Sequence, residues 1–207
     1  MIDHLVLATP DVSSTADALR REWGVDVLPG GSHLGRGTRN ELVNLGNGAY
    51  LEIVGPDAGQ AAPPFARPFG VDDIDEPRLV AWCARPAMPI DEAAEAIDML
   101  GFSRGAVSAM SRLRPDGVLL EWLLTAPMVG HPHEGTVPFL IDWLASPHPT
   151  ASLPRQCTLQ SLRLSHPRAH LLRAVMAELG IDNRVSVDEG PAGMTAVVIT
   201  PLGNFTL

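Results

Sequence analysis

The stretch Gly48-Ala-Tyr-Leu-Glu52 has a counterpart in Gly117-Val-Leu-Leu-Glu121, and both place a glutamate at the end of a strand-like segment that starts with glycine. A third copy, Gly203-Asn-Phe-Thr-Leu207, has leucine where the other two have glutamate. A segment that recurs in this way indicates a chain built from repeated units. The acidic residue is therefore present in some units and absent from one.

Two further landmarks recur along the chain with nearly the same spacing. An apolar run ends at a proline three times, at Pro10, Pro86 and Pro167. A helix-like segment then ends at a glycine followed by an apolar residue, at Gly24, Gly101 and Gly180. The prolines lie 76 and 81 residues apart, and the glycines lie 77 and 79 residues apart. A period of this length is typical of a whole supersecondary module.

The pattern within the first unit predicts a strand, a helix and three further strands. Ala16, Leu19 and Trp23 have helical spacing, and Gly24 ends the helix because glycine tolerates the left-handed conformation. We therefore expect an α+β protein made of repeated βαβββ-type modules in one domain, residues 1–207. The modules should span about 1–55, 78–126 and 158–207, with connectors at 56–77 and 127–157.

Composition limits the partners of this chain. Its 15 basic and 24 acidic residues give a net charge of −9, which opposes binding to nucleic acid. Neither an apolar run long enough to cross a bilayer nor a signal peptide is evident, so we expect a cytoplasmic protein without a membrane partner. Cys83 and Cys157 lie in or beside apolar runs without CxxC spacing, which favours buried, reduced thiols.

Strand periodicity separates the side chains of the first strand into two sets, because alternate residues point to the same face. One face should carry Ile2, His4, Val6 and Ala8, and the other Asp3, Leu5 and Leu7. Tyr50, Glu52 and Val54 should likewise share a face.

His4 and Glu52 then lie among apolar neighbours, where a carboxylate without a partner is costly or becomes neutral. A divalent metal would satisfy both groups, and Glu121 would supply a second carboxylate. Zn²⁺, Mn²⁺, Fe²⁺ and Ni²⁺ all accept this ligand set. The alternative is a His4–Glu52 pair in the core, with Glu121 reaching solvent at a sheet edge.

Three segments together resemble the glyoxalase-like branch of the vicinal oxygen chelate superfamily: Ile2-Asp-His-Leu-Val6, the glycine-rich stretch 30–40, and Tyr50-Leu-Glu-Ile-Val54. The resemblance implies paired βαβββ modules whose strands form cupped mixed sheets around a metal site. Metal-dependent members take ligands from the first and last strands of two modules. This implies His4, Glu52 and Glu121 as ligands, whereas the fourth position falls near Val80, which cannot bind metal.

The pairing of the modules decides the third ligand. Pairing of modules one and two retains Glu121. In a pairing of modules one and three, Ser161 and Leu207 stand at the ligand positions of module three, and Glu121 drops out. His33 could then complete a site of two histidines and one carboxylate.

Residues 30–38 contain four glycines together with polar side chains that suit a small, oxygen-rich ligand. The alternative is a hairpin that is rich in glycine only for turn geometry. We expect substrate contacts from the stretch itself, from the strand of Glu52 and from cup-lining tryptophans: Arg36, Thr38, Asn40, Tyr50, Trp82 and Trp122.

These observations favour a divalent-metal-dependent enzyme that chelates two oxygens of a small substrate, with Glu52 or Glu121 moving protons. Isomerase, lyase and dioxygenase chemistry all stay open. The alternative is a metal-free protein that binds or sequesters a small molecule in the same cup. A homodimer is a reasonable expectation, because strands of such modules can pair across chains.

Overall fold

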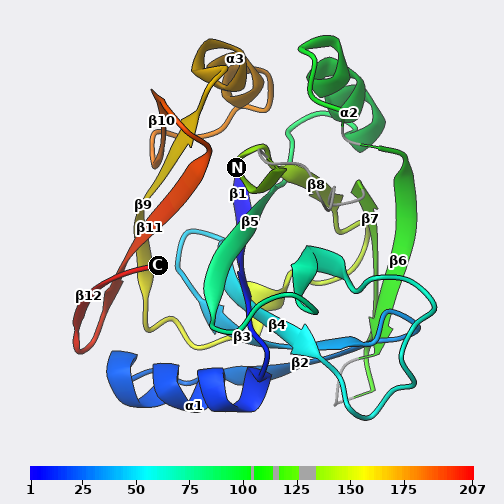
Figure 1. Cartoon of the computed structure of the whole chain (residues 1–207), viewed down its shortest axis with the longest axis vertical. Helices are drawn as coiled ribbons and strands as arrows, with labels where there is room; N and C mark the ends of the chain where they lie inside the picture. Colours follow the sequence, from blue (N-terminus) through cyan, green and yellow to red (C-terminus); the bar gives the residue numbers. More distant parts are fainter. Residues whose placement is uncertain (104, 114–116, 126–133) are drawn as a thin grey trace.

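The computed structural model describes the chain except for residues 104, 114–116 and 126–133. Its strands form one mixed sheet of eight strands, in the order β2-β3-β4-β1-β5-β8-β7-β6, and one sheet of four, in the order β10-β9-β11-β12. The larger sheet curls into a cup, and the smaller sheet lies at its side (Figure 1). This arrangement confirms the predicted α+β fold of cupped mixed sheets.

The first module forms half of the large sheet and has the predicted order of strand, helix and three strands. Its elements are β1 (Ile2–Ala8), α1 (Val12–Trp23), β2 (Leu28–His33), β3 (Thr38–Asn44) and β4 (Tyr50–Pro56). Helix α1 begins where the Asp11 carboxylate accepts a hydrogen bond from the Ser14 amide (3.1 Å), and it ends at Gly24 with φ of 68°. Strand β4 returns parallel to β1 and pairs Val6 with Glu52.

The second module forms the other half, and modules one and two are joined by the antiparallel pairing of β1 with β5. Its elements are β5 (Arg78–Ala84), α2 (Ile90–Met99), β6 (Val107–Leu113), β7 (Leu119–Thr125) and β8 (Phe139–Asp142). Strand β8 lies within the segment that we expected to be a connector. It pairs parallel with β5, as β4 does with β1. Strand β7, which carries Glu121, is therefore not the last strand of its module.

The third module has the predicted element order but a different strand pairing. Its elements are β9 (Thr158–His166), α3 (Ala169–Glu178), β10 (Val185–Glu189), β11 (Gly193–Thr200) and β12 (Gly203–Thr206). Strand β9 lies between β10, which is parallel to it, and β11, which is antiparallel. In modules one and two the first strand instead pairs with the last strand of its own module. Module three is therefore not a third copy, and its strands stay outside the cup.

The two faces of the large sheet bury different sets of side chains. The outer face packs against the helices and includes Ile2, Leu5, Leu51 and Trp82. The inner face forms a second apolar cluster that includes Val6, Tyr50, Trp122, Phe139 and Ile141. Three short 3₁₀ helices lie in the connections, at Pro68–Gly70, Glu134–Thr136 and Pro149–Ala151. The inner face is the one that encloses a cavity.

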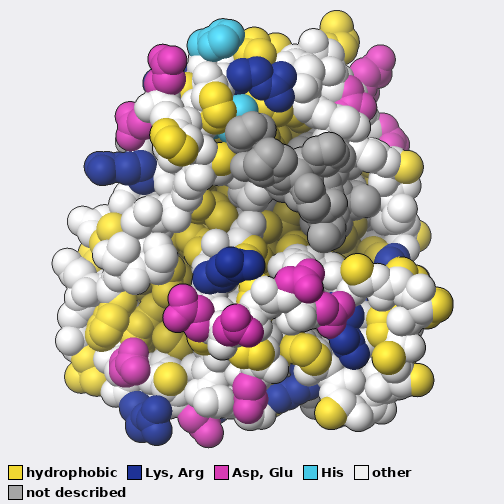
Figure 2. Space-filling view, in the orientation of Figure 1, with side chains coloured by type: hydrophobic (Ala, Val, Ile, Leu, Met, Phe, Trp, Pro, Cys, Tyr) yellow, Lys and Arg dark blue, Asp and Glu magenta, His cyan; other side chains and the backbone are white. Residues whose placement is uncertain are grey.

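Charges of both signs are mixed on the surface. On the face shown in Figure 2, acidic side chains are interspersed with basic ones. None of the helices in the described part of the chain is both long and apolar enough to cross a membrane. Cys83 and Cys157 are buried and free, as predicted, and burial raises the pKa of Cys157 to about 11.

Candidate functional site

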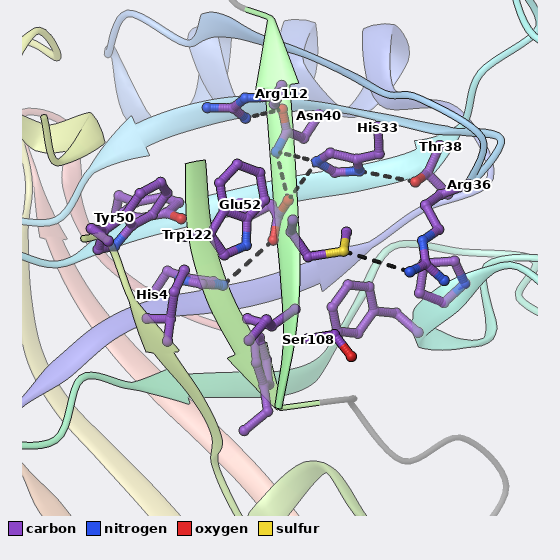
Figure 3. Close-up of a pocket in the computed structure, with 17 residues that line it drawn as sticks. His4, His33, Arg36, Thr38, Asn40, Tyr50, Glu52, Ser108, Arg112 and Trp122 are labelled. Atoms are coloured by element: carbon purple, nitrogen blue, oxygen red, sulfur yellow. Dashed lines mark hydrogen bonds and ion pairs between the residues drawn. The ribbon is translucent and has the colours of Figure 1, made fainter. Parts of the chain in front are cut away.

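A cavity of about 150 Å³ lies inside the cup and is lined by both modules (Figure 3). An apolar cavity of about this size in another protein accommodates a benzene molecule, so the space suits a small molecule. The first module supplies most of the polar lining, and the connector after it adds Pro68 and Phe69. Strands β7 and β8 and the residue that follows β8 supply a largely apolar wall that includes Trp122, Phe139, Ile141 and Trp143.

The structure brings most of the predicted site residues together and places two of them elsewhere. The cavity is lined by His4, His33, Arg36, Thr38, Asn40, Tyr50, Glu52 and Trp122. Glu121 is exposed, because Leu120 and Trp122 take the inner face of β7 and alternation turns Glu121 outward. Trp82 is fully buried on the outer face, where its Nε1 donates to the Thr136 carbonyl (3.0 Å). Neither residue lines the cavity, so the predicted roles of Glu121 at the metal and of Trp82 at the substrate are wrong.

Two imidazoles approach the Glu52 carboxylate from different strands. His4 Nε2 lies 3.6 Å from Glu52 Oε2, and His33 Nε2 lies 3.6 Å from Glu52 Oε1 (Figure 3). His4 comes from β1, His33 from the end of β2, and Glu52 from the middle of β4. All three side chains are largely screened from solvent. The sheet thus brings three side chains that can bind a metal close together, around the Glu52 carboxylate.

The Asn40 amide holds Glu52 and His33 in these positions. Its Nδ2 donates to Glu52 Oε1 (2.5 Å) and lies 3.2 Å from His33 Nε2. The Arg112 guanidinium donates to Asn40 Oδ1 (2.9 Å), which fixes the orientation of the amide because arginine can only donate. His33 Nε2 therefore accepts, and its Nδ1–H donates to Thr38 Oγ1 (2.9 Å). Any Cβ at position 30 would collide with Asn40 Oδ1, so this approach requires Gly30.

Burial shifts the pKa of two groups in the cavity. It lowers the pKa of His33, with the Glu52 charge opposing this shift and the Arg112 charge supporting it. The lowered pKa favours the neutral ring, whose Nε2 accepts the hydrogen bond from Asn40. Burial also raises the pKa of Tyr50 well above its usual value, and the charges of Asp3 and Glu52 act in the same direction. Tyr50 is therefore a neutral phenol, and its ring stacks on His4 at 4.7 Å.

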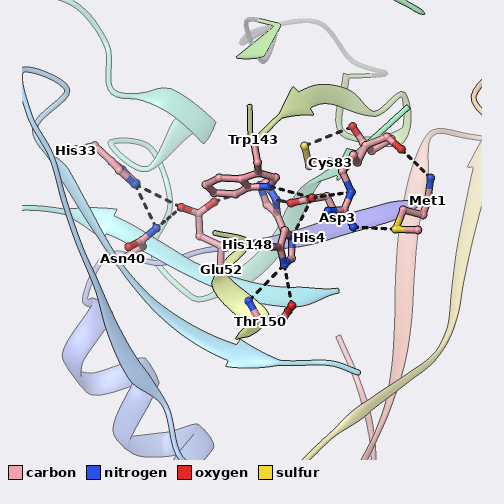
Figure 4. Close-up of polar contacts among 12 residues, drawn as sticks. Met1, Asp3, His4, His33, Asn40, Glu52, Cys83, Trp143, His148 and Thr150 are labelled. Atoms are coloured by element: carbon pink, nitrogen blue, oxygen red, sulfur yellow. Dashed lines mark hydrogen bonds and ion pairs between the residues drawn. The ribbon is translucent and has the colours of Figure 1, made fainter. Parts of the chain in front are cut away.

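Asp3 orients His4, in contrast to the prediction that their side chains point to opposite faces. A β-bulge between Ile2 and His4 interrupts the alternation, so Ile2 packs in the outer core and Asp3 lies beside His4. Asp3 Oδ1 lies 2.8 Å from His4 Nδ1 (Figure 4). Because the carboxylate accepts, Nδ1 carries the proton of a neutral imidazole and the Nε2 lone pair faces the cavity.

Asp3 is itself held by further donors. Trp143 Nε1 donates to Asp3 Oδ2 (3.1 Å), and His148 Nε2 lies 3.1 Å from the same oxygen. The Thr150 amide donates to His148 Nδ1 (3.3 Å), so the His148 proton is on Nε2 and points to Asp3. Burial alone would raise the pKa of Asp3, but the hydrogen bonds from His148 and His4 hold it well below its usual value.

Asp3, His4 and Cys83 form one group in the described part of the chain whose ligand atoms lie within 4.8 Å of one another. Both oxygens of Asp3 already accept hydrogen bonds from nitrogen donors. Burial raises the pKa of Cys83 well above its usual value, and the charges of Asp3 and Glu52 add to the shift. A metal needs the thiolate form, so this group is better suited to support His4 than to hold an ion.

Sequence reasoning missed several residues of the site. Arg112, Phe139 and Ile141 line the cavity from module two, and His148 supports Asp3 from a connection. The apolar run in 137–143 indicated a buried segment, but Phe139, Leu140 and Ile141 are consecutive and give no strand periodicity. Nothing local to Arg112 marks it, because its role depends on Asn40 in a different module. His131 and His133, which flank Pro132 in the connector 127–157, lie outside the described residues.

Two βαβββ modules around a cavity with two imidazoles and one carboxylate define a protein of the glyoxalase-like class. The model of the glyoxalase-like domain family matches residues 2–180, and the chain belongs to this family. This match confirms the resemblance that the sequence motifs indicated. A comparison with curated proteins found no match.

Comparison with solved structures gives the fold. A hypothetical protein from Staphylococcus aureus has a TM-score of 0.62 at 13% identity, with 92% of this chain and 87% of that chain covered. A methylmalonyl-CoA epimerase variant from Streptomyces coelicolor, in complex with 2-nitronate-propionyl-CoA, has a TM-score of 0.43 at 19% identity, covering 72% and 98%. A 4-hydroxymandelate synthase variant from Streptomyces coelicolor has a TM-score of 0.43 at 13% identity, covering 100% and 61%. Only the first likeness is close enough to support the fold.

Proposed function

We propose that this protein is an enzyme that binds a divalent metal through His4, His33 and Glu52 and acts on a small, oxygen-rich substrate. The observation that carries this proposal is the approach of two imidazole nitrogens to the Glu52 carboxylate, each at 3.6 Å, inside a cavity. Zn²⁺, Mn²⁺, Fe²⁺ and Ni²⁺ all accept two imidazoles and one carboxylate. When bound, such an ion supplies Lewis acidity toward two oxygens of one substrate.

The donor set fits a cation. His4 Nε2 presents a lone pair to the cavity, because Nδ1 of the same ring donates to Asp3. The lone pair of His33 Nε2 accepts from Asn40 Nδ2 (3.2 Å), and a bound ion would take the place of this hydrogen bond. The Asn40 side-chain amide donates to Glu52 Oε1 and not to Oε2. Three electron-pair donors therefore face one region, and they attract a positive ion or a proton rather than one another.

Other residues position the substrate and move protons in this proposal. Tyr50 keeps its proton and can donate a hydrogen bond to a substrate oxygen from its place beside His4. Glu52 is the carboxylate among the described lining residues, so it is the candidate base. The apolar wall of module two excludes water from the reacting atoms. Isomerase, lyase and dioxygenase chemistry can all use this arrangement, and substrate screening with the loaded enzyme distinguishes them.

Metal analysis of purified protein tests the proposal. We expect about one equivalent of a transition metal in the wild type and a strong loss in His4→Ala, His33→Ala and Glu52→Gln. Glu121→Gln is the matched control, because its carboxylate is exposed on the other face and should leave the metal content unchanged. Full metal content in Glu52→Gln would contradict the ligand assignment.

The alternative of a metal-free binding protein is an outcome of the same experiment. Its signature is a wild-type protein that takes up no metal on reconstitution and whose ligand affinity is unchanged by Glu52→Gln. The homodimer and the cytoplasmic location stay predictions. Light scattering of the purified protein and localisation of a tagged chain would check them.

A further inference from the structure

The cavity has a charge opposite in sign to that of the whole chain. Two arginines, Arg36 and Arg112, and one carboxylate, Glu52, line it, whereas the chain carries a net charge of −9. A cavity with excess positive charge in an acidic protein favours an anionic ligand over a neutral or cationic one.

Arg112 is the cation that lies inside the cavity. It comes from β6, is 5% exposed, and donates from Nη1 to Asn40 Oδ1 at 2.9 Å. This bond places the guanidinium next to the amide that also contacts Glu52 and His33. Arg36, by contrast, is exposed, and its guanidinium lies 5.8 Å from the Phe65 ring. Arg112 can therefore act at the centre of the cavity, and Arg36 at its rim.

Aromatic side chains form part of the cavity lining from module two. Trp122 and Trp143 lie with ring centroids 5.3 Å apart, and Phe139 lies 5.3 Å from His4 on the same wall. Flat rings and branched aliphatic groups pack well against such a surface. The cavity thus offers a charged, hydrogen-bonding side and an apolar side to one small molecule.

We propose that the substrate is a small carboxylic acid with an apolar body, aromatic or branched aliphatic, and that Arg112 binds its carboxylate. The guanidinium pairs with the carboxylate through charge-assisted hydrogen bonds, while the body packs against Trp122 and Trp143. The carbon atoms next to the carboxylate then lie beside His4, His33 and Glu52. The inference rests on the proposed function for what happens at those atoms, but the binding itself requires no metal.

Binding to EDTA-treated protein tests this inference without any turnover. Two matched pairs serve as probes: phenylacetate with phenylacetamide, and 3-methylbutanoate with 3-methylbutanamide. Calorimetry, supported by the fluorescence of the cavity tryptophans, should show at least one acid binding about 10- to 100-fold more tightly than its amide. If neither acid binds more tightly than its amide in the wild type, the inference is wrong.

Substitution of Arg112 then tests whether this residue causes the preference for the acid over the amide. Arg112→Gln should reduce the affinity for the acid about 10- to 100-fold and leave the affinity for the amide unchanged. Arg36→Gln should reduce the affinity for the acid only a few-fold. Persistence of the acid preference in Arg112→Gln would overturn the assignment. If that variant does not fold, Arg112→Lys decides: its point charge should keep part of the preference, about tenfold below wild type. An undiminished preference there would count against bidentate pairing with Arg112.

The result is separable from the metal proposal. His4→Ala separates the two proposals, because it should lose the metal while Arg112, which is not a proposed ligand, still gives the apoprotein its preference for the acid. A protein without metal that still loses acid binding in Arg112→Gln would refute the proposed enzyme and support the carboxylate site. A protein that holds metal but shows no preference for the acid would support the proposed enzyme and refute the carboxylate site.

Discussion

Modules one and two share one strand order but differ in what they present to the cup. Strand β4 pairs parallel with β1, and β8 pairs parallel with β5. On the inner face, however, β1 and β4 carry His4 and Glu52, whereas β8 carries Phe139 and Ile141. The same backbone frame thus holds metal-ligating groups in one half and an apolar wall in the other.

This difference makes one part of the cavity polar and another part apolar. A ligand with a polar end and an apolar end can enter in one orientation, with its oxygens toward the ligand set of module one and the adjacent Arg112. Two symmetrical halves would instead hold the ligand in either orientation. The comparison also predicts separate consequences of substitution: changes in module one should affect binding of the ion, and changes in the wall of module two should affect packing.

The largest expected effect on stability is that of Phe139→Ala, which removes a ring that is 3% exposed. Loss of this buried ring should lower the free energy of unfolding by about 3 kcal/mol, through lost transfer energy and the space left behind. Metal content should stay at the wild-type level. Urea unfolding and metal analysis of the same preparation check both parts. Loss of metal from a folded variant would show that the wall takes part in the chemistry.

The strand and helix pattern of module one could be predicted because its signals are local. Helical spacing, Gly24 and the alternation around Glu52 identify its elements. His33 was considered as a ligand through the resemblance, and Asn40 as a substrate contact through the polar, glycine-rich stretch. No spacing rule placed either residue beside Glu52. Asp3 was placed on the wrong face because a β-bulge, which depends on pairing with β5, interrupts the alternation.

The errors in modules two and three have a common physical origin. Pairing between strands is decided by contacts that are distant in sequence, so a recurring period gives element order but not partners. Strand β8 is short, spanning Phe139–Asp142, and follows a long connection, which hides it from a search for periodicity. The assignment of Glu121 failed for this reason, because β7 was taken as the last strand of its module. Arg112 was missed since its partner, Asn40, comes from β3.

The next effect in size concerns a residue that does not itself line the cavity. Asp3→Asn keeps the shape of the side chain but removes the charge that holds the His4 proton on Nδ1. We expect metal affinity to fall about 10- to 100-fold, because such carboxylate partners orient imidazole ligands. Titration with a competing chelator measures this change. Asp188→Asn, at an exposed position of β10, is the control and should bind metal as the wild type does.

A wild-type metal affinity in Asp3→Asn would mean that the bulge at Asp3 serves only to bury a hydrogen-bonded network. In that case the variant should still lose stability, since His148 and Trp143 would face a weaker acceptor. Affinity and stability measured together therefore separate a residue that positions His4 from one that only supports the fold.

The smallest expected effect, at Glu121→Gln, is also the most direct test of the difference between the modules. Glu121 occupies the sequence position that corresponds to Glu52, yet its side chain is exposed on the far face of β7. The substitution should change the free energy of unfolding by less than about 0.5 kcal/mol and leave metal content and carboxylate binding at wild-type values. Glu52→Gln, the same chemical change in module one, should lose the metal. If both variants lost it, strand β7 would have to present its carboxylate to the cavity, and the two modules would share the chemistry that the structure assigns to one.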